Sequence, residues 1–131
     1  QVLTQEELHI GSLDPRRDFT YVADTVSGFI KAAEAEDPIG EVYNLGTGTD
    51  VTIQEIVDLV YKITGRDLPI IQEAARMRPE KSEVMRLLSD YSKAQAELGW
   101  QPEVDLEEGL RRTVAWVGEN LDVYRPEEYQ K

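Results

Sequence analysis

The residues best suited to bind an anion lie at positions 76–86, with the sequence RMRPEKSEVMR, here called the basic segment. Four of its side chains are cationic and two are glutamates, in a chain whose formal net charge is -12. Arginine offers a rigid planar fork of donors that fits phosphate oxygens two at a time, and Arg76, Arg78 and Arg86 lie here. Glu83 can accept hydrogen bonds from nearby sugar hydroxyls. The segment therefore predicts a nucleotide-diphosphate site; a solvated surface loop with scattered charges is the alternative.

A second arginine, Arg17, lies where the turn residues GSLDP at positions 11–15 give way to a strand predicted over positions 16–22. From such a rigid edge, Arg17 could point into a cleft. Its neighbour Asp18 is expected to fix the local backbone or to pair with an arginine. On local sequence alone, a surface ion pair is the simpler interpretation of Arg17.

Other residue types with reactive side chains give no pattern that indicates catalysis. His9 is the only histidine, and the sequence shows no partners that would build a triad or a zinc site around it. The absence of cysteine excludes disulfides and thiolate metal sites. No spacing of carboxylates singles out an acid/base pair. We therefore predict no catalytic residue and no metal site in this chain.

The motif Gly46-x-Gly48, between a predicted strand and a predicted helix, invites comparison with dinucleotide-binding loops. Two features argue against that reading. Val51 occupies the position of the third glycine, and Asp50 stands at the helix start, where its charge would repel a phosphate. A tight turn is the better interpretation, and we expect no cofactor-binding residue here.

Hydrophobic periodicity predicts an α/β domain with three main helices, one short helix and several short strands. The helices are expected at about 24–36, 52–65, 90–99 and 105–121, and the strands at 8–10, 16–22, 41–45 and 68–72. Asp24, Thr52, Asp90 and Asp105 are the expected helix caps, with Glu55 and Glu108 completing two of them. Residues 1–7 resemble the end of an amphipathic helix. The first helix is expected to bury its apolar face, and Pro69 suggests an edge position for the last strand.

Composition limits the partners that this chain can have. A hydrophobic fraction of 40% and a charged fraction of 31% are ordinary for a soluble globular protein. No apolar run approaches the roughly 20 residues needed to cross a bilayer, and the first residues lack signal-peptide features. The acidic balance argues against binding to nucleic acid or to an anionic membrane. We expect a cytoplasmic protein that binds neither.

Taken together, several stretches resemble the extended short-chain dehydrogenase/reductase family of nucleotide-sugar epimerases and dehydratases. The matching pieces are RDFTYVAD at 17–24, VYNLG at 42–46, RP at 78–79, SEV at 82–84, DxSKA at 90–94, LGWxP at 98–102 and LEEGL at 106–110. Each piece is weak alone, but their order and spacing match across nearly the whole chain. The set is most similar to nucleotide-N-acetylglucosamine 4,6-dehydratases, and then to GDP-mannose 4,6-dehydratases, whose arginine-to-glutamate spacing is shorter.

The resemblance covers only the C-terminal part of such enzymes and implies a substrate-binding lobe, residues 1–131, without the N-terminal Rossmann domain. By position it implies that Arg17 and Arg78 bind the diphosphate, with Arg76 a weaker candidate. Glu83 would bind the ribose hydroxyls, and the strand from Leu8 to Ile10 would border the base. Family chemistry is oxidation at C4 by bound NAD, loss of water and return of the hydride to C6.

The groups that perform this chemistry lie upstream in the family. No tyrosine stands four residues before a lysine here, so the family's Tyr/Lys pair is absent. The resemblance implies that NAD binds to the missing N-terminal domain, and we expect no cofactor on this chain alone. The expected partners are a nucleotide diphosphate sugar and that missing domain.

Two alternatives to a dehydratase lobe remain open. The chain could come from an NAD-dependent nucleotide-sugar 4-epimerase, or it could be a stand-alone nucleotide-binding or interaction module. A lobe that lacks its neighbouring domain should also expose apolar residues, which favours association through that surface.

Overall fold

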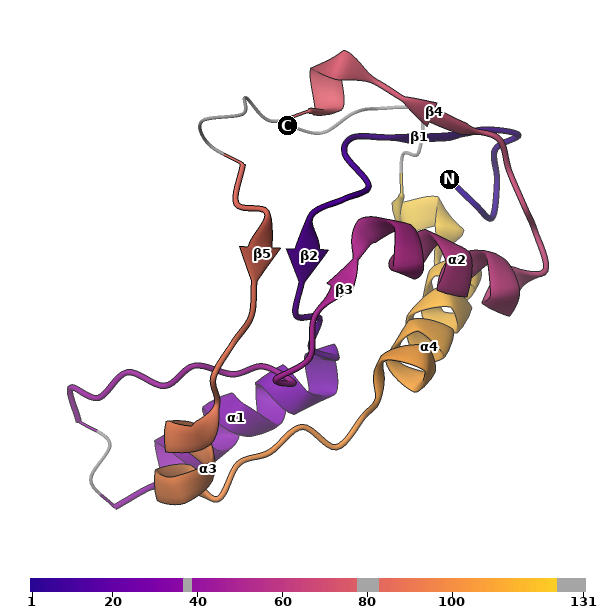
Figure 1. Cartoon of the computed structure of the whole chain (residues 1–131). Helices are drawn as coiled ribbons and strands as arrows, with labels where there is room; N and C mark the ends of the chain where they lie inside the picture. The colour runs from indigo at the N-terminus through magenta and orange to yellow at the C-terminus, as the bar shows by residue number, and fades with distance from the viewer. Residues whose placement is uncertain (37–38, 78–82, 125–131) are drawn as a thin grey trace.

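The computed structural model describes residues 1–36, 39–77 and 83–124 (Figure 1). Their elements run in the order β1 (Leu8–Ile10), β2 (Arg16–Arg17), α1 (Val22–Glu34), β3 (Val51–Thr52), α2 (Ile53–Thr64), β4 (Ile70–Gln72), η1 (Ala74–Arg76), β5 (Arg86–Leu87), α3 (Ser92–Leu98), α4 (Leu106–Glu119) and η3 (Leu121–Val123). The predicted α/β class, with three longer helices and the short α3, is confirmed. None of the described helices is long and apolar enough to span a bilayer.

The described strands form two small sheets at different levels of the molecule (Figure 1). In the first sheet β1 pairs in parallel with β4, with Leu8 opposite Ile70. In the second sheet β2 is central, antiparallel to β3 and parallel to β5, so that Arg16 lies opposite both Thr52 and Arg86. This second register brings together three segments that are far apart in the sequence.

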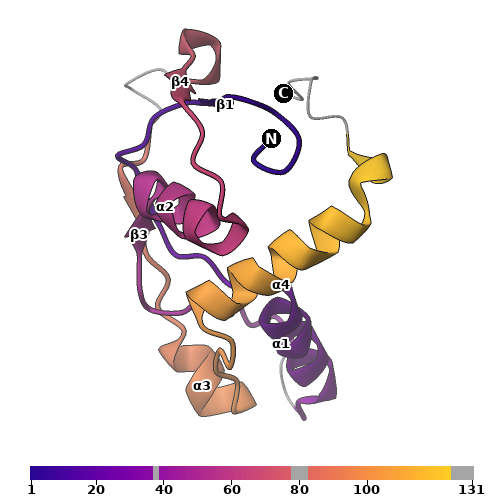
Figure 2. The same ribbon diagram turned by 90° about the vertical axis from the view of Figure 1, so that its right-hand side faces the viewer.

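Helix α2 packs against α4, and α1 packs against α3 near the opposite end of the molecule from β1 and β4 (Figures 1 and 2). The predicted capping box of α2 is confirmed, because the Thr52 hydroxyl accepts from the Glu55 N–H and the Glu55 carboxylate accepts from the Thr52 N–H. Gly65 ends α2 with φ 67°, a left-handed conformation that favours glycine. Asp105 caps α4 as predicted.

The buried apolar residues gather in two places. Leu8, Val57 and Leu68 form one cluster under α2. Trp100 is the centre of the second and is fully buried, with its indole Nε1 donating to the Asp24 carbonyl at 2.9 Å. The ring of Tyr91 meets that of Trp100 edge-on at 5.8 Å between centroids.

Asp24 does not cap α1, contrary to the prediction. The helix begins earlier, at Val22, and Asp24 is buried in its first turn. There the Asp24 carboxylate accepts from the Val104 N–H at 3.1 Å. A buried acceptor that ties α1 to the segment before α4 explains the aspartate at this position better than a cap does.

The prediction that α1 buries its apolar face is also wrong. Val26, Phe29 and Ile30 are 49%, 69% and 52% exposed, whereas Asp24 and Gly28 face inward. The reason is close packing on the opposite face: a Cβ added at Gly28 would lie 2.5 Å from the Leu45 side chain and 3.2 Å from the Trp100 indole nitrogen. Only a residue without a side chain fits there.

Four other expectations from sequence are corrected. Residues 41–45 form no strand, because among the described residues no other strand pairs with them. The strand expected at 16–22 has only the two residues of β2, and residues 1–7 form turns rather than the end of a helix. The last strand is shorter than predicted, at Ile70–Gln72.

In α3 the first helical residue is Ser92, whose N–H donates to the Asp90 carboxylate at 2.9 Å.

Candidate functional site

The site is built on β2, where successive side chains point to opposite faces. On one face the Arg17 Nη2 donates to the Glu83 Oε1 at 2.8 Å, and Arg17 Nη1 donates to the carbonyl of Arg16 at 2.8 Å. The two ion-paired side chains are 20% and 15% exposed. Arg17 and Glu83 are 66 positions apart, and the sequence indicated each of them separately. In the structure they form an ion pair.

Hydrogen bonds hold the guanidinium of Arg17 in place, but they engage only some of its N–H donors. It has five N–H donors, and in the described part of the chain it donates one bond to Glu83 and one to a carbonyl. The remaining donors have no partner among the described residues. Pairing with a carboxylate also fixes the plane of the fork, which lowers the entropy lost when an anion binds.

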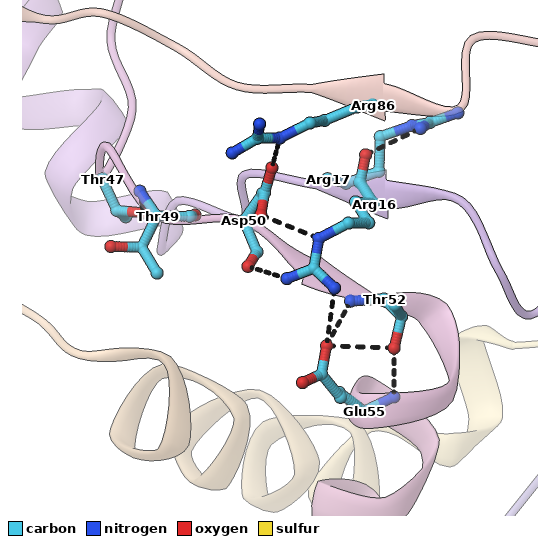
Figure 3. Close-up of polar contacts among 8 residues, drawn as sticks. All are labelled: Arg16, Arg17, Thr47, Thr49, Asp50, Thr52, Glu55 and Arg86. Atoms are coloured by element: carbon cyan, nitrogen blue, oxygen red, sulfur yellow. Dashed lines mark hydrogen bonds and ion pairs between the residues drawn. The ribbon is translucent and has the colours of Figure 1, made fainter.

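The other face of β2 carries an ion-pair network centred on the buried Asp50 (Figure 3). Arg16 donates to the Asp50 carboxylate at 2.9 Å and to its carbonyl at 2.8 Å. Arg86 on β5 donates to the other carboxylate oxygen of Asp50, and Arg16 also lies 3.6 Å from Glu55. The network links β2, β3, β5 and the start of α2, and so holds the strand that carries Arg17.

The charges around Asp50 favour its ionised form. Hydrogen bonds from Arg86 and then from Arg16 lower the pKa of the Asp50 carboxyl below its ordinary value, although desolvation opposes them. Only 6% of the Asp50 side chain is exposed. An ionised aspartate at this place is therefore a fixed countercharge for two arginines.

Asp18 holds the loop at positions 46–48, 29 positions away, whereas the sequence led us to expect a contact with its local backbone or with an arginine. Its carboxylate accepts from the N–H of Thr47 at 2.8 Å, from the N–H of Gly48 at 2.9 Å and from the Thr47 hydroxyl at 2.6 Å. The amides of the Gly-x-Gly turn thus hold an anion from the chain itself. Gly46 has no room for a side chain, since a Cβ there would lie 2.2 Å from Ser89 Cβ.

The remaining predicted site residues lie in different surroundings. Arg78 falls outside the described residues. Arg76, in η1, pairs with Glu73 at 2.6 Å. Leu8 is buried in the core, and its neighbour Ile10 packs partly buried against the same cluster. A nucleobase beside β1 would therefore contact the side of the strand that faces away from this cluster.

Two hollows on the described surface could hold a small molecule. One, of about 430 Å³, is lined by Arg76 and His9 together with Gln1, Gln5, Glu6, Glu7 and Glu73. His9 Nδ1 lies 2.6 Å from the Glu73 carboxylate there. The other, of about 420 Å³, lies between Phe19 on one side and residues 102–106 on the other. Both are within the size range of small-molecule sites.

Sequence reasoning missed the Asp50 network and the role of Arg16 and Arg86 within it. From the sequence, Asp50 was interpreted only as a charge that would repel phosphate. No local spacing links these three residues, because the register of β2 with β3 and β5 alone brings them together. In the described part of the chain, no cluster of three or more acidic or histidine side chains could hold a metal ion.

Comparison with known proteins places this chain in a family. Residues 1–113 match the family model described as GDP-mannose 4,6 dehydratase. The UDP-glucuronate 4-epimerase of Thermodesulfobacterium geofontis is 34% identical over 83% of this chain and 32% of its own length. The GDP-6-deoxy-D-mannose reductase of Pseudomonas aeruginosa is 32% identical over 85% of this chain and 36% of its own length.

Solved structures agree with these matches. The UDP-glucose 4-epimerase of Thermotoga maritima, solved with UDP-glucose, has a TM-score of 0.76 and 36% identity over 92% of this chain and 37% of that one. The UDP-glucuronic acid 4-epimerase of Bacillus cereus, solved with UDP-glucuronic acid and NAD, has a TM-score of 0.76 and 29% identity over 87% of this chain and 36% of that one.

The fold and the matches define the class as extended short-chain dehydrogenases/reductases that act on nucleotide sugars. This chain belongs to the GDP-mannose 4,6 dehydratase family of nucleotide-sugar epimerases and dehydratases within that class, and it corresponds to the C-terminal part. It spans about a third of the length of the relatives it matches.

Proposed function

We propose that this chain is the nucleotide-sugar-binding lobe of an NAD-dependent nucleotide-sugar 4,6-dehydratase, here called the parent protein. Arg17 and Arg78 bind the substrate diphosphate, and Glu83 accepts from the ribose hydroxyls. The observation that carries the proposal is the contact between Arg17 and Glu83. It puts a phosphate-binding fork beside a sugar-binding carboxylate, as a nucleotide diphosphate requires.

The physical role of the lobe is to position the substrate. Binding energy from the remote nucleotide holds the hexose in a defined place, and this makes later steps effectively intramolecular. NAD, held by the rest of the parent protein, would supply hydride transfer at the hexose. Among the described residues, Arg17 is held by Glu83 and by the carbonyl of Arg16, and the Asp50 network supports the strand that carries it.

A 4-epimerase is the second candidate, and the names of the matched relatives favour it. Several are 4-epimerases, and three of the matched solved structures contain a UDP-sugar. The two reactions share nucleotide binding and differ in their product. An epimerase inverts one hydroxyl, whereas a dehydratase leaves a 4-keto-6-deoxy sugar that has lost one water.

The test uses the parent protein, with the upstream residues present and NAD bound. It is incubated with UDP-N-acetylglucosamine and with GDP-mannose, and the products are resolved by mass and NMR. Loss of 18 Da, the mass of one water, supports the dehydratase, and an isomer of unchanged mass supports the epimerase. A parent protein that binds NAD and leaves both UDP- and GDP-sugars unchanged contradicts both.

Calorimetry on the isolated chain separates the lobe from a stand-alone module. A lobe lacks one wall of its cleft, so we expect weak or undetectable binding of the same nucleotide sugars. Tight binding by the chain alone would support a self-sufficient nucleotide-binding module instead.

A further inference from the structure

Asp18, the residue that follows Arg17, links three segments that are far apart in the sequence. Its N–H donates to the Leu87 carbonyl at 3.0 Å and so extends the pairing of β2 with β5. Its carboxylate accepts from two N–H groups of the turn at positions 46–48, at 2.8 and 2.9 Å, and from the Ser89 N–H at 3.4 Å. One side chain thus joins the ends of β2 and β5 to this turn.

The surroundings of the Asp18 side chain suit a carboxylate in particular. The Thr47 hydroxyl donates to Oδ1 at 2.6 Å, and the Gly48 N–H donates to Oδ2. Gly48 has φ 72°, a left-handed conformation that favours glycine, and a Cβ added at Gly46 would lie 2.8 Å from Oδ2. Both carboxylate oxygens accept hydrogen bonds, so a side-chain amide, which has one acceptor oxygen, cannot replace Asp18 fully.

These contacts stabilise the register on which the Arg17–Glu83 ion pair depends. Arg17 lies opposite Leu87 in the pairing of β2 with β5, and Glu83 precedes Leu87 by four positions on the same segment. Each of these strands is only two residues long. A slip by one residue moves a strand by about 3.3 Å, enough to break the 2.8 Å contact between Arg17 and Glu83. The carboxylate of Asp18 holds the end of this short pairing.

We propose that Asp18 is a positioning residue of the nucleotide site: through the turn at 46–48 and through β5, it fixes Arg17 and Glu83 relative to each other. This inference rests on the proposed function of those two residues. Asp18 does not itself contact the ligand, since hydrogen bonds from the chain engage both of its oxygens and its charge would repel a phosphate. Its effect on affinity arises because a prearranged pair loses less conformational entropy when a nucleoside diphosphate binds.

Calorimetric titration of the parent protein with UDP and with GDP measures this effect. Asp18→Asn keeps the size of the side chain and should raise both dissociation constants about tenfold, because the arginine and the carboxylate are no longer held together. Unchanged dissociation constants in this variant would overturn the inference while leaving the proposed function intact. A wild-type parent protein that binds neither UDP nor GDP would contradict the proposed function, and this inference with it.

A double-mutant cycle separates positioning from a general contribution to stability. In a parent protein that already carries Arg17→Ala, the further change Asp18→Asn should raise the dissociation constants by less than about threefold, because the residue that it positions is gone. A residue that only stabilises the fold would have the same effect in both backgrounds. A tenfold loss with and without Arg17 would therefore overturn the inference.

Asp105→Ala is the matched control for lost stability. Asp105 also accepts from a backbone N–H, that of Glu108 at 2.8 Å, but it does so at the start of α4. Its loss should lower the melting temperature and leave the dissociation constants within about twofold. Equal losses of affinity from Asp105→Ala and Asp18→Asn would show that affinity follows stability and would overturn the inference.

A milder variant decides the inference if Asp18→Asn prevents folding. Thr47→Val keeps the carboxylate of Asp18 and removes one of its donors, the hydroxyl at 2.6 Å. It should raise the dissociation constants for UDP and GDP about threefold, and this effect should disappear in the Arg17→Ala background. Wild-type affinity in Thr47→Val would then overturn the positioning role of Asp18.

Discussion

At the scale of single residues, β2 places two arginines in different roles. Arg16 is a structural cation that pairs with Asp50 and lies near Glu55. Arg17 pairs with Glu83, and its other N–H donors have no side-chain partner among the described residues. Alternation along a strand separates the two roles, because adjacent side chains point to opposite faces. A structural ion-pair network can therefore support a binding arginine without competing for it.

Replacing Arg17 with alanine in the parent protein should lower affinity for nucleotide sugars by about 10- to 100-fold, the usual effect of losing a charge-assisted contact. Titration calorimetry with UDP-N-acetylglucosamine and GDP-mannose measures this. Arg111→Ala is the control, since Arg111 on α4 pairs only with the exposed Glu107 and Glu108 in the described structure. An Arg17→Ala protein with wild-type affinity would remove the arginine from the site.

Asp50 makes the chain sensitive to acid. Because the pKa of the Asp50 carboxyl is lowered in the folded state, its stabilising contribution is present above the ordinary aspartate pKa of about 4 and is lost as the pH falls through the lower folded value. Asp50→Asn should lower the melting temperature at pH 7 by roughly 5 °C, because Arg16 and Arg86 lose their countercharge. It should also flatten the fall in stability as the pH decreases below about 4. Thermal unfolding over this range measures both, and a variant with the slope of the wild type would contradict this role.

At the scale of elements, local signals determined the helix ends, and long-range packing determined the rest. The capping box of α2, its terminal Gly65 and the Asp105 cap of α4 were all predictable because the residues involved lie within one or two turns of each other. Asp24 was misassigned because its partners, Val104 and Trp100, are about 80 residues away. The strand predicted at 41–45 does not form, because among the described residues no strand pairs with this segment.

The capping box gives a direct test at this scale. Thr52→Ala removes the acceptor for the Glu55 N–H and should lower the free energy of unfolding by about 1 kcal/mol. Urea unfolding of the isolated chain measures the change, with Thr113→Ala on exposed α4 as the control that leaves the caps intact. An unchanged midpoint for Thr52→Ala would mean that α2 does not depend on its first turn.

At the scale of the whole molecule, few large side chains are fully buried and many apolar ones are exposed. Trp100 is the only large side chain described as completely buried, whereas Phe29, Val42 and Leu87 are each at least 60% exposed. The expectation of exposed apolar surface, drawn from the resemblance to part of a longer enzyme, is confirmed. Which face would be exposed was not predictable, because periodicity identifies an apolar stripe but not the partner that covers it.

This exposure predicts weak association of the isolated chain as its concentration rises. Added salt should strengthen it by screening the negative net charge. Analytical ultracentrifugation from about 5 to 500 µM measures it, and Phe29→Asp should reduce it. A compact monomer at every concentration and salt level would contradict the prediction.

The central claim, that Arg17 and Glu83 together hold a nucleotide diphosphate, is tested most directly by NMR titration of the isolated chain with UDP and GDP. The account predicts saturable shifts, with dissociation constants near the millimolar range, at the Arg17 side-chain Nε and the Glu83 amide. The same shifts should be absent in Arg17→Ala and retained in Arg111→Ala. Shifts that leave Arg17 and Glu83 unaffected at saturation, or none at any nucleotide concentration in the chain and in the parent protein alike, would contradict it.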